Sequence, residues 1–176
     1  MKDAFLYKAD FDQVNWLNSR RKKKMSEMEV EKVTFQNNRF GELTIALSDC
    51  LEFSNGIPGF ERCKGFGLIE VEDESPFLRL LSLDEPQLGF VLLNPLLIWP
   101  DYDPHVGREE LAQLGIETTA QLAIYCIVTM SEEPSQVTAN LQGPIYLNSE
   151  TKQAKQMILV DDRYGTKHAL IENDED

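Results

Sequence analysis

Short runs of hydrophobic residues separated by turn residues make up most of the chain. In VTFQNNRFGELTIAL, residues 33–47, apolar and polar positions alternate around Gly41, and Asn37-Asn38 supplies a turn. Alternation with a period of two is typical of a strand with one buried face, and turn residues between two such runs favour a hairpin. We therefore expect an antiparallel pair of strands at the start of the folded region.

Two longer runs are apolar on both faces, as strands buried between two layers are. PFLRLLSLDEP, residues 76–86, and QLGFVLLNP, residues 87–95, follow one another directly, which predicts a hairpin. AQLAIYCIVTM, residues 120–130, is rich in β-branched and aromatic residues and predicts a central strand. Further strands are expected in four stretches: CLEF, residues 50–53; GFGLIEVED, residues 65–73; QVTANLQGPIYLN, residues 136–148; and AKQMILVDD, residues 154–162.

One short helix is predicted near residues 107–115. Pro104 precedes it, Glu109 and Glu110 stand in its first turn, where the helix dipole favours acids, and Gly115 is placed to end it. Strands recur about every eight to twelve residues with turn residues between them. The predicted fold class is therefore all-β: an antiparallel sandwich or small antiparallel β-barrel with this one connecting helix.

The stretch FSNGIPGFE, residues 53–61, holds two turn-forming dipeptides between apolar neighbours. Gly56 and Gly59 can take positive φ without steric cost, while Pro58 fixes φ and has no N–H for a sheet ladder. This stretch is therefore expected to end a strand.

Glycine-rich turns also cradle phosphate, so a ligand loop is the alternative for the same stretch. No Lys-Ser or Lys-Thr pair follows it, the glycine spacing fits neither phosphate-binding motif, and Glu61 would repel an anion. We favour a double turn between strands, with Ile57 and Phe60 directed inward.

The chain carries a strong negative charge that is unevenly distributed. Thirty acids against 17 bases give −13, and residues 1–30 hold seven bases and five acids, so the remaining residues carry −15. Such a domain repels nucleic acid, because affinity for phosphate backbones comes from Lys and Arg. The charge favours a basic protein partner, and acidity that serves solubility alone is the alternative.

Composition also indicates the cellular compartment of the protein. With 42% hydrophobic residues and no apolar run near the length of a membrane span, we expect no membrane association. The N-terminus lacks the apolar core of a signal peptide, and Cys50, Cys63 and Cys126 form no CxxC pair. Both features favour a cytoplasmic protein with reduced thiols.

Three regions are expected: an N-terminal extension, residues 1–32, flexible or weakly helical; a β domain, residues 33–170; and an acidic tail, residues 171–176. The basic run RRKKK, residues 20–24, lies in the extension. Flanking acids favour a solvated tail, and RNA binding through this run is the alternative.

Candidate catalytic and metal-binding residues are sparse. His105 and His168 form no HxH or HxxxH pair, and no cysteine stands in a catalytic motif, so we expect no enzyme activity, no metal and no cofactor. Acids cluster at turns, where solvent reaches them. Two acids converging in an apolar pocket would instead make a small carboxylate-dependent hydrolase in a β-barrel, which is the alternative function.

Six segments, in this order and at this spacing, resemble the FliW family of flagellar assembly factors. They are FGEL, FSNGIPGFE, SPFLRLLSLDEPQLGFVLLNP, WPDYD, VTANLQGPIYLN and KQMILVDDRYGTKH, and the resemblance covers residues 33–168. The chain departs from the family pattern at Gln142-Gly143, where an aliphatic-Ala pair is usual, and at Lys167, where arginine is usual. Lysine lacks the planar fork with which arginine binds carboxylates.

The resemblance implies a small antiparallel β-barrel and a non-enzymatic role. FliW-like proteins bind newly made flagellin in the cytoplasm, and they bind the dimeric RNA-binding regulator CsrA so that it releases flagellin messenger RNA. The implied function couples flagellin synthesis to flagellin secretion. We expect a protein that is monomeric when alone and binds neither nucleic acid nor membrane.

Site residues follow from this implied role. For CsrA we predict an acidic surface made of Glu70, Glu72, Asp73, Glu74, Asp84 and Glu85. For flagellin, whose terminal segments expose apolar faces before assembly, we predict aromatic anchors at Phe60, Trp99 and Tyr102. The remaining motif residues are expected to shape the scaffold: Asn55, Gly56, Pro58, Gly59, Asn140 and Pro144.

Overall fold

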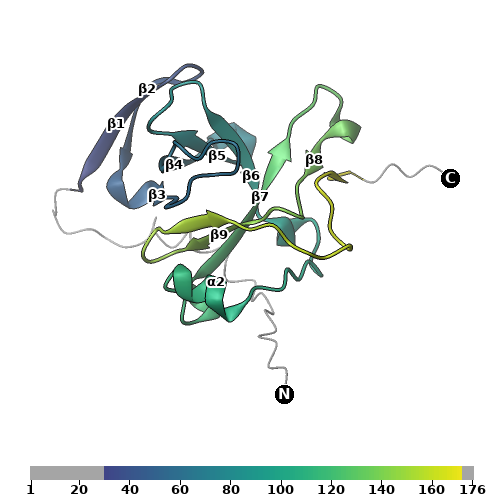
Figure 1. The fold of residues 1–176 in the computed structure, drawn as a ribbon. Helices are drawn as coiled ribbons and strands as arrows, with labels where there is room; N and C mark the ends of the chain where they lie inside the picture. The colour runs from purple at the N-terminus through teal and green to yellow at the C-terminus, as the bar shows by residue number, and fades with distance from the viewer. Residues whose placement is uncertain (1–29, 172–176) are drawn as a thin grey trace.

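The computed structural model describes residues 30–171, and Figure 1 shows their arrangement. Strands β1 (Lys32–Asn37) and β2 (Gly41–Ala46) pair antiparallel as a separate two-stranded sheet. The Asn37 side chain closes the turn, because its Oδ1 accepts a hydrogen bond from the backbone N–H of Arg39 at 2.9 Å. The hairpin predicted from the alternating pattern is confirmed.

The other strands form one antiparallel sheet of nine strands. Its neighbours run in the order β10-β9-β7-β6-β5-β4-β3, and β8 pairs with both β7 and β11. The all-β prediction is confirmed, and the predicted hairpin of two buried strands is β5–β6. The bounds are β3 (Cys50–Glu52), β4 (Gly65–Glu70), β5 (Leu78–Ser82), β6 (Gly89–Leu93), β7 (Leu122–Thr129), β8 (Thr138–Ala139), β9 (Ile145–Asn148), β10 (Ala154–Gln156) and β11 (His168–Ala169).

The sheet is not closed into a barrel, so this detail of the prediction was wrong. Its two end strands, β3 and β10, meet at one isolated parallel bridge between Glu52 and Gln153. The backbone N–H of Glu52 donates to the carbonyl oxygen of Lys152 at 3.0 Å, but β3 ends there and the chain turns away at Ser54. Closure needs a continuous ladder at every edge, and a strand of three residues is too short to supply one.

The predicted connecting helix is α2 (Arg108–Gln113). Glu109 and Glu110 stand in its first turn, and Gly115, just past its end, has a φ of +64°. A positive φ at this position is the usual way for a helix to end at glycine. Short 3₁₀ turns join the other elements: η3 (Leu47–Asp49), η4 (Glu72–Glu74), η5 (Pro95–Leu97), η6 (Thr119–Gln121) and η7 (Pro134–Gln136).

Strand β7 lies at the centre of the sheet and is buried on both faces. Cys126 and Val128 pack into one hydrophobic cluster with Leu93, while Tyr125 packs into a second cluster with Phe66. Because a strand covered on both faces has apolar residues at successive positions, this strand was recognisable as a continuous hydrophobic run. The prediction of a central strand is confirmed.

The three cysteines carry free thiols. Cys126 is fully buried, and burial raises the pKa of its thiol to about 12. Burial is also the main cause of the raised pKa of the Cys63 and Cys50 thiols. None is activated as a nucleophile, because an activated thiol has a lowered pKa.

Parts of the sequence-based prediction fall on residues that the structure does not describe. The extension, residues 1–32, lies outside the described residues apart from its last positions, where Lys32 begins β1. The basic run, residues 20–24, lies outside them, as does the acidic tail beyond Ile171. Within residues 30–171, no helix has the length and apolar character needed to cross a membrane.

Candidate functional site

Strands β6 and β7 separate at one end and open a groove between them. Their ladder runs from Leu93↔Cys126 to Val91↔Val128. Beyond it, β6 stays paired with β5 as far as Gly89, while β7 pairs with β8. The resulting β6–β7 groove has a volume of about 790 Å³ and is lined by Arg39, Asp73, Glu74, Ser75, Phe77, Arg79, Gly89, Phe90, Val91, Ile127, Val128, Thr129 and Met130.

The apolar side of the β6–β7 groove carries an aromatic pair. Phe90 is half-buried, and its ring centroid lies 5.4 Å from that of Phe60 with the rings near perpendicular, at 78°. Phe60 is 40% exposed and Met130 is 48% exposed. Large apolar side chains that stay open to solvent beside a groove are typical of a protein-binding surface.

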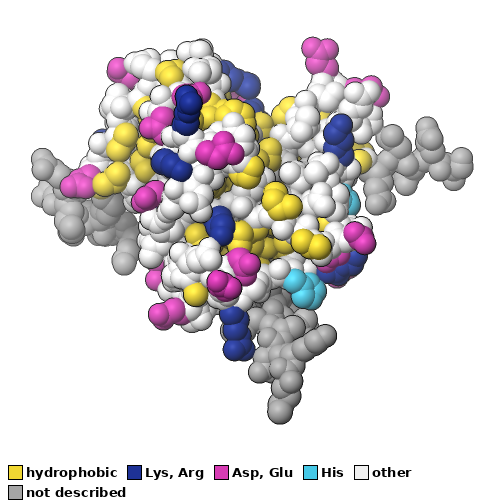
Figure 2. All heavy atoms as spheres, in the orientation of Figure 1, with side chains coloured by type: hydrophobic (Ala, Val, Ile, Leu, Met, Phe, Trp, Pro, Cys, Tyr) yellow, Lys and Arg dark blue, Asp and Glu magenta, His cyan; other side chains and the backbone are white. Residues whose placement is uncertain are grey.

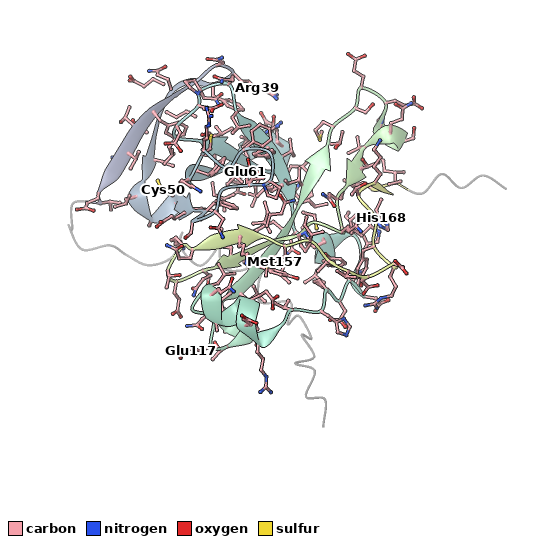
Figure 3. All side chains as sticks on the ribbon, viewed as in Figure 1. Arg39, Cys50, Glu61, Glu117, Met157 and His168 are labelled. Carbon is pink, nitrogen blue, oxygen red and sulfur yellow. The ribbon has the colours of Figure 1, made fainter. Side chains whose placement is uncertain are left out.

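The charged side of the groove is organised around Glu74. Its Oε2 accepts a hydrogen bond from Arg79 Nε at 2.5 Å, and its Oε1 lies 3.4 Å from Arg39 Nη2. The hydrogen bond from Arg79 is the largest cause of the lowered pKa of the Glu74 carboxyl. Asp73 stands beside this cluster and is exposed, and Arg39 extends from the β1–β2 turn (Figure 3). The groove therefore joins apolar surface to a rim of balanced charge, two acids (Asp73, Glu74) and two arginines (Arg39, Arg79).

The six acids predicted for CsrA do not all lie in one place. Asp73 and Glu74 line the groove. Asp84 is on the β5–β6 turn, where its Oδ2 accepts hydrogen bonds from the backbone N–H groups of Lys64 (3.0 Å) and Gly65 (3.3 Å). The remaining residues are Glu70, exposed at the end of β4; Glu72, in η4; and Glu85, beside Asp84.

Of the three predicted aromatic anchors, the structure brings one to the groove. Phe60 borders it through Phe90. Trp99 is half-buried against a core cluster, with its ring centroid 6.2 Å from that of His168. Tyr102 is 3% exposed, so its prediction as a surface anchor was wrong. Its hydroxyl is fixed in the core by a bond to a backbone carbonyl.

The stretch FSNGIPGFE forms the predicted double turn. Gly56 and Gly59 have φ of +72° and +86°, and Ile57 is 2% exposed. Phe60 points outward, so its predicted inward direction was wrong. Glu61 stabilises the turn, because its Oε1 accepts a hydrogen bond from the Gly59 N–H at 2.8 Å, which is the largest cause of its lowered carboxyl pKa.

The other scaffold residues have local roles. Asn140 Oδ1 accepts a hydrogen bond from the Gly143 N–H at 2.8 Å, and the Pro144 carbonyl accepts one from the Met157 N–H at 2.8 Å. Asn55 and Pro58 are exposed in the double turn. These residues shape the chain around the sheet rather than the groove.

Several groove residues were not recognisable from sequence. Phe90 lies in a strand whose residues are apolar at successive positions, so nothing local marks it as half-exposed. Arg79 stands in such a strand too, and its single charge was the one available signal. Arg39 and Met130 lie in turns far apart in sequence, and they meet only through the separation of β6 and β7.

The described residues offer little to a metal ion. Within residues 30–171, no group of three or more His, Cys, Asp or Glu side chains is placed to hold one. The lining of the β6–β7 groove suits a polypeptide, which can use its apolar and its charged sides together.

Comparison with known proteins identifies the family. The model of the FliW protein family matches residues 34–170. The flagellar assembly factor FliW of Caldicellulosiruptor saccharolyticus is 35% identical over 146 residues, which cover 83% of this chain and 95% of that protein. The FliW proteins of Thermotoga neapolitana and Geobacillus sp. are 38% and 41% identical, covering 77% and 74% of this chain and 92% and 90% of their own.

A solved structure agrees with this assignment. A crystal structure of the flagellar assembly factor FliW superposes with a TM-score of 0.76 at 36% sequence identity, over 81% of this chain and 100% of the other. At this identity and coverage, fold and sequence point to the same relatives. The chain belongs to the FliW family of flagellar assembly factors.

Proposed function

We propose that this protein is a cytoplasmic flagellar assembly factor that binds flagellin and antagonises a CsrA-type translational regulator, without catalytic activity of its own. The observation that carries the proposal is the β6–β7 groove, which places exposed apolar residues beside the acids Asp73 and Glu74 and their neighbouring arginines in a FliW-family chain. The two proposed partners differ in chemistry, and the groove offers a surface for each.

Flagellin engages the apolar side of the groove. Its terminal segments present apolar faces before assembly, and such faces bind in grooves lined by aromatic and flexible apolar side chains. Phe60 and Phe90 supply the aromatic pair, and Met130 supplies the flexible side chain. Trp99 remains a secondary candidate, since part of its ring is accessible.

CsrA engages the acidic surface. A protein that grips RNA is basic where it does so, and this chain carries −13. The contact is proposed for Asp73 and Glu74 at the groove, with Glu70 and Glu72 close to them in sequence, and for Asp84 and Glu85 on the separate β5–β6 turn. Opposite potentials speed encounter at low salt, so the association rate should depend strongly on ionic strength.

Displacement of RNA tests the CsrA proposal. Adding this purified protein to a CsrA–RNA complex at low salt should release the RNA, and Asp73→Lys should slow the release several-fold. Glu117→Lys is the matched control, because Glu117 is exposed and lies far from Arg39 and the groove (Figure 3). Intact CsrA–RNA complex after addition of the unchanged protein would contradict the proposal.

Binding of monomeric flagellin tests the other side of the groove. Phe60→Ala should weaken the complex about tenfold, as removal of a central aromatic anchor does. Leu97→Ala removes a side chain of similar exposure, 43%, and should leave affinity unchanged. Equal affinities for the two variants would move the flagellin site away from the groove.

The hydrolase alternative has little support at this site. A general acid needs a carboxyl whose pKa is raised by apolar surroundings. The pKa of Glu74 is lowered instead, because Arg79 donates a hydrogen bond to the charged carboxylate. Of the two groove acids, Asp73 is exposed to solvent.

A further inference from the structure

One edge of the large sheet is left without a neighbouring strand. After β10, the chain continues beside the residues that lead into β9: the N–H of Met157 donates to the Pro144 carbonyl and the N–H of Leu159 donates to the Gln142 carbonyl, both at 2.8 Å. Because bonding direction alternates along an antiparallel strand, the intervening residues direct their N–H and C=O groups away from β9. These groups belong to Ile158 and to Val160, which follows in the same register.

Neither of these two residues has a backbone partner. Among residues 30–171, no hydrogen bond reaches the N–H or C=O of Ile158 or Val160. Their side chains are also uncovered, since Ile158 is 65% exposed and Val160 is fully exposed, whereas Met157 and Leu159 are buried. We call residues 154–160 the β10 edge.

The β10 edge borders the gap between the two end strands of the open sheet, β3 and β10. In the described part of the chain, strand β3 is bridged to Gln153, the residue before this edge, and Ser54 then donates a hydrogen bond to the Gln153 side chain at 3.1 Å before the chain turns away. Hydrophobic side chains gather in the middle of this face (Figure 2), and Met157 marks the same region in Figure 3. Among the described residues, no strand pairs with β10 on the side away from β9.

Natural sheets protect exposed edges with charged residues, prolines or bulges. In the β10 edge, Lys155 is the one charged residue, and residues 157–160, sequence MILV, contain neither charge nor proline. An unprotected apolar edge in a soluble domain invites pairing with another chain. The edge is thus better explained as a binding surface than as an ordinary solvent-facing strand.

We propose that the β10 edge binds an extended polypeptide segment of a partner protein, which adds to the sheet as one more strand. Main-chain groups of Ile158 and Val160 bond to the segment, and its alternate aliphatic side chains cover these two residues. Asp161 and Asp162 directly follow the edge; Asp161 is paired with Arg163 at 2.7 Å, and the exposed Asp162 leaves this end negative, so the segment carries a basic residue there and no acid. Only the identification of the partner as flagellin rests on the proposed function, and it makes the β10 edge a second flagellin contact besides the β6–β7 groove.

A second copy of this chain fits the edge less well than a partner segment does. Two such edges would bring together two chains of −13 each. A pair of seven-residue strands also buries far less than the roughly 1,200 Å² of a stable protein interface. An unfolded segment needs no large interface, because strand pairing itself supplies its hydrogen bonds.

Residue-resolved amide hydrogen exchange of the full chain tests the proposal. In the free protein, the amides of Met157 and Leu159 should exchange slowly and those of Ile158 and Val160 quickly. Two probes are added separately: purified monomeric flagellin, and a synthetic ten-residue peptide alternating valine and threonine with a lysine at each end. Exchange at Ile158 and Val160 should slow at least tenfold.

Control reagents distinguish strand addition from nonspecific hydrophobic binding. The same peptide with glutamate in place of lysine should protect these amides less. Val160→Lys should weaken peptide binding at least fivefold, whereas Ile171→Lys, which changes an exposed apolar residue elsewhere, should not. Protection by the peptide without protection by flagellin supports the edge and removes flagellin as its partner.

Three outcomes would overturn the proposal. One is unchanged exchange at Ile158 and Val160 with both probes. Another is slow exchange in the free protein that increases with protein concentration, which would assign the edge to a second copy. The last is slow exchange in the free protein that disappears when residues 1–29 are deleted, which would mean that this segment of the same chain covers the edge.

Discussion

Tyr102 donates a hydrogen bond from its hydroxyl to the carbonyl oxygen of Leu141, across 2.7 Å in the core. The contact fastens the proline-containing loop before α2 to the segment between β8 and β9. Tyr102 is 3% exposed and Leu141 is 2% exposed, so water cannot replace the bond without entering the core. The tyrosine of the aromatic segment WPDYD thus serves the scaffold.

Tyr102→Phe should lower the free energy of unfolding by about 1–2 kcal/mol, because it leaves a buried carbonyl without its donor. Affinity for flagellin and CsrA should stay unchanged, since the side chain does not reach the surface. Urea unfolding followed by circular dichroism measures the first effect, and a binding titration measures the second.

Tyr146→Phe is the matched control. The Tyr146 hydroxyl is buried, and no residue in the described part of the chain accepts or donates a hydrogen bond there. Its removal should leave the free energy of unfolding unchanged or raise it slightly. Equal losses in the two variants would contradict the assignment of the Tyr102 effect to its hydrogen bond.

Elements that depend on near neighbours were predictable from the sequence. The β1–β2 hairpin follows from alternation and an Asn turn, and α2 follows from Glu109, Glu110 and Gly115. In each, the signals and the structure lie within about fifteen residues of one another. Family membership was likewise recognisable, because it rests on ordered motifs rather than on contacts.

Features that depend on distant contacts were not predictable. Whether the sheet closes is decided by how far β3 runs beside β10, residues about a hundred positions apart. The burial of Tyr102 depends on a partner 39 positions away. The groove exists because the β6–β7 ladder ends at Val91↔Val128, while β7 continues to Thr129, paired with β8 on its other edge. Hydrophobic pattern shows which residues avoid water, but not which of them remain half-covered.

Gly56→Ala should destabilise the fold by more than 2 kcal/mol. Gly56 has a φ of +72°, and a Cβ there would lie 2.6 Å from the Glu61 Cα, a backbone atom that cannot rotate away. The strained backbone alone costs about 1–2 kcal/mol, and the clash adds to it. A thermal unfolding scan of the variant measures the loss.

Gly59→Ala separates the cost of the strained backbone from the cost of the steric clash. Its φ is +86°, but a Cβ there would meet nothing within 4 Å, so only the backbone cost of about 1–2 kcal/mol applies. A loss as large as that of Gly56→Ala would show that the close approach of Glu61 is unimportant.

Asp84→Ala should cost about 1 kcal/mol of stability, because two backbone N–H groups, on Lys64 and Gly65, lose their acceptor. Glu85→Ala is the control: its side chain accepts from the exposed Gln87 at 3.3 Å, and its loss should cost less than about 0.5 kcal/mol. If Asp84→Ala also slows binding to CsrA, Asp84 belongs to the interface as well as to the turn.

Glu74→Gln should change stability in a pH-dependent way. The pKa of the Glu74 carboxyl is lowered from 4.5 by the hydrogen bond from Arg79, so the unfolded chain takes up the proton at a higher pH than the folded protein. The pair therefore stabilises the fold fully above about pH 4.5 and loses this contribution as pH falls through the folded pKa. Since Glu74 is partly exposed, we expect a loss of about 1 kcal/mol at pH 7 in the variant.

Denaturant unfolding between pH 7 and pH 2 should show the two stability curves converging at the acid end, and Glu117→Gln should follow the unchanged protein throughout. A difference that stays constant down to pH 2 would mean that Glu74 stabilises the fold through packing rather than through its charge.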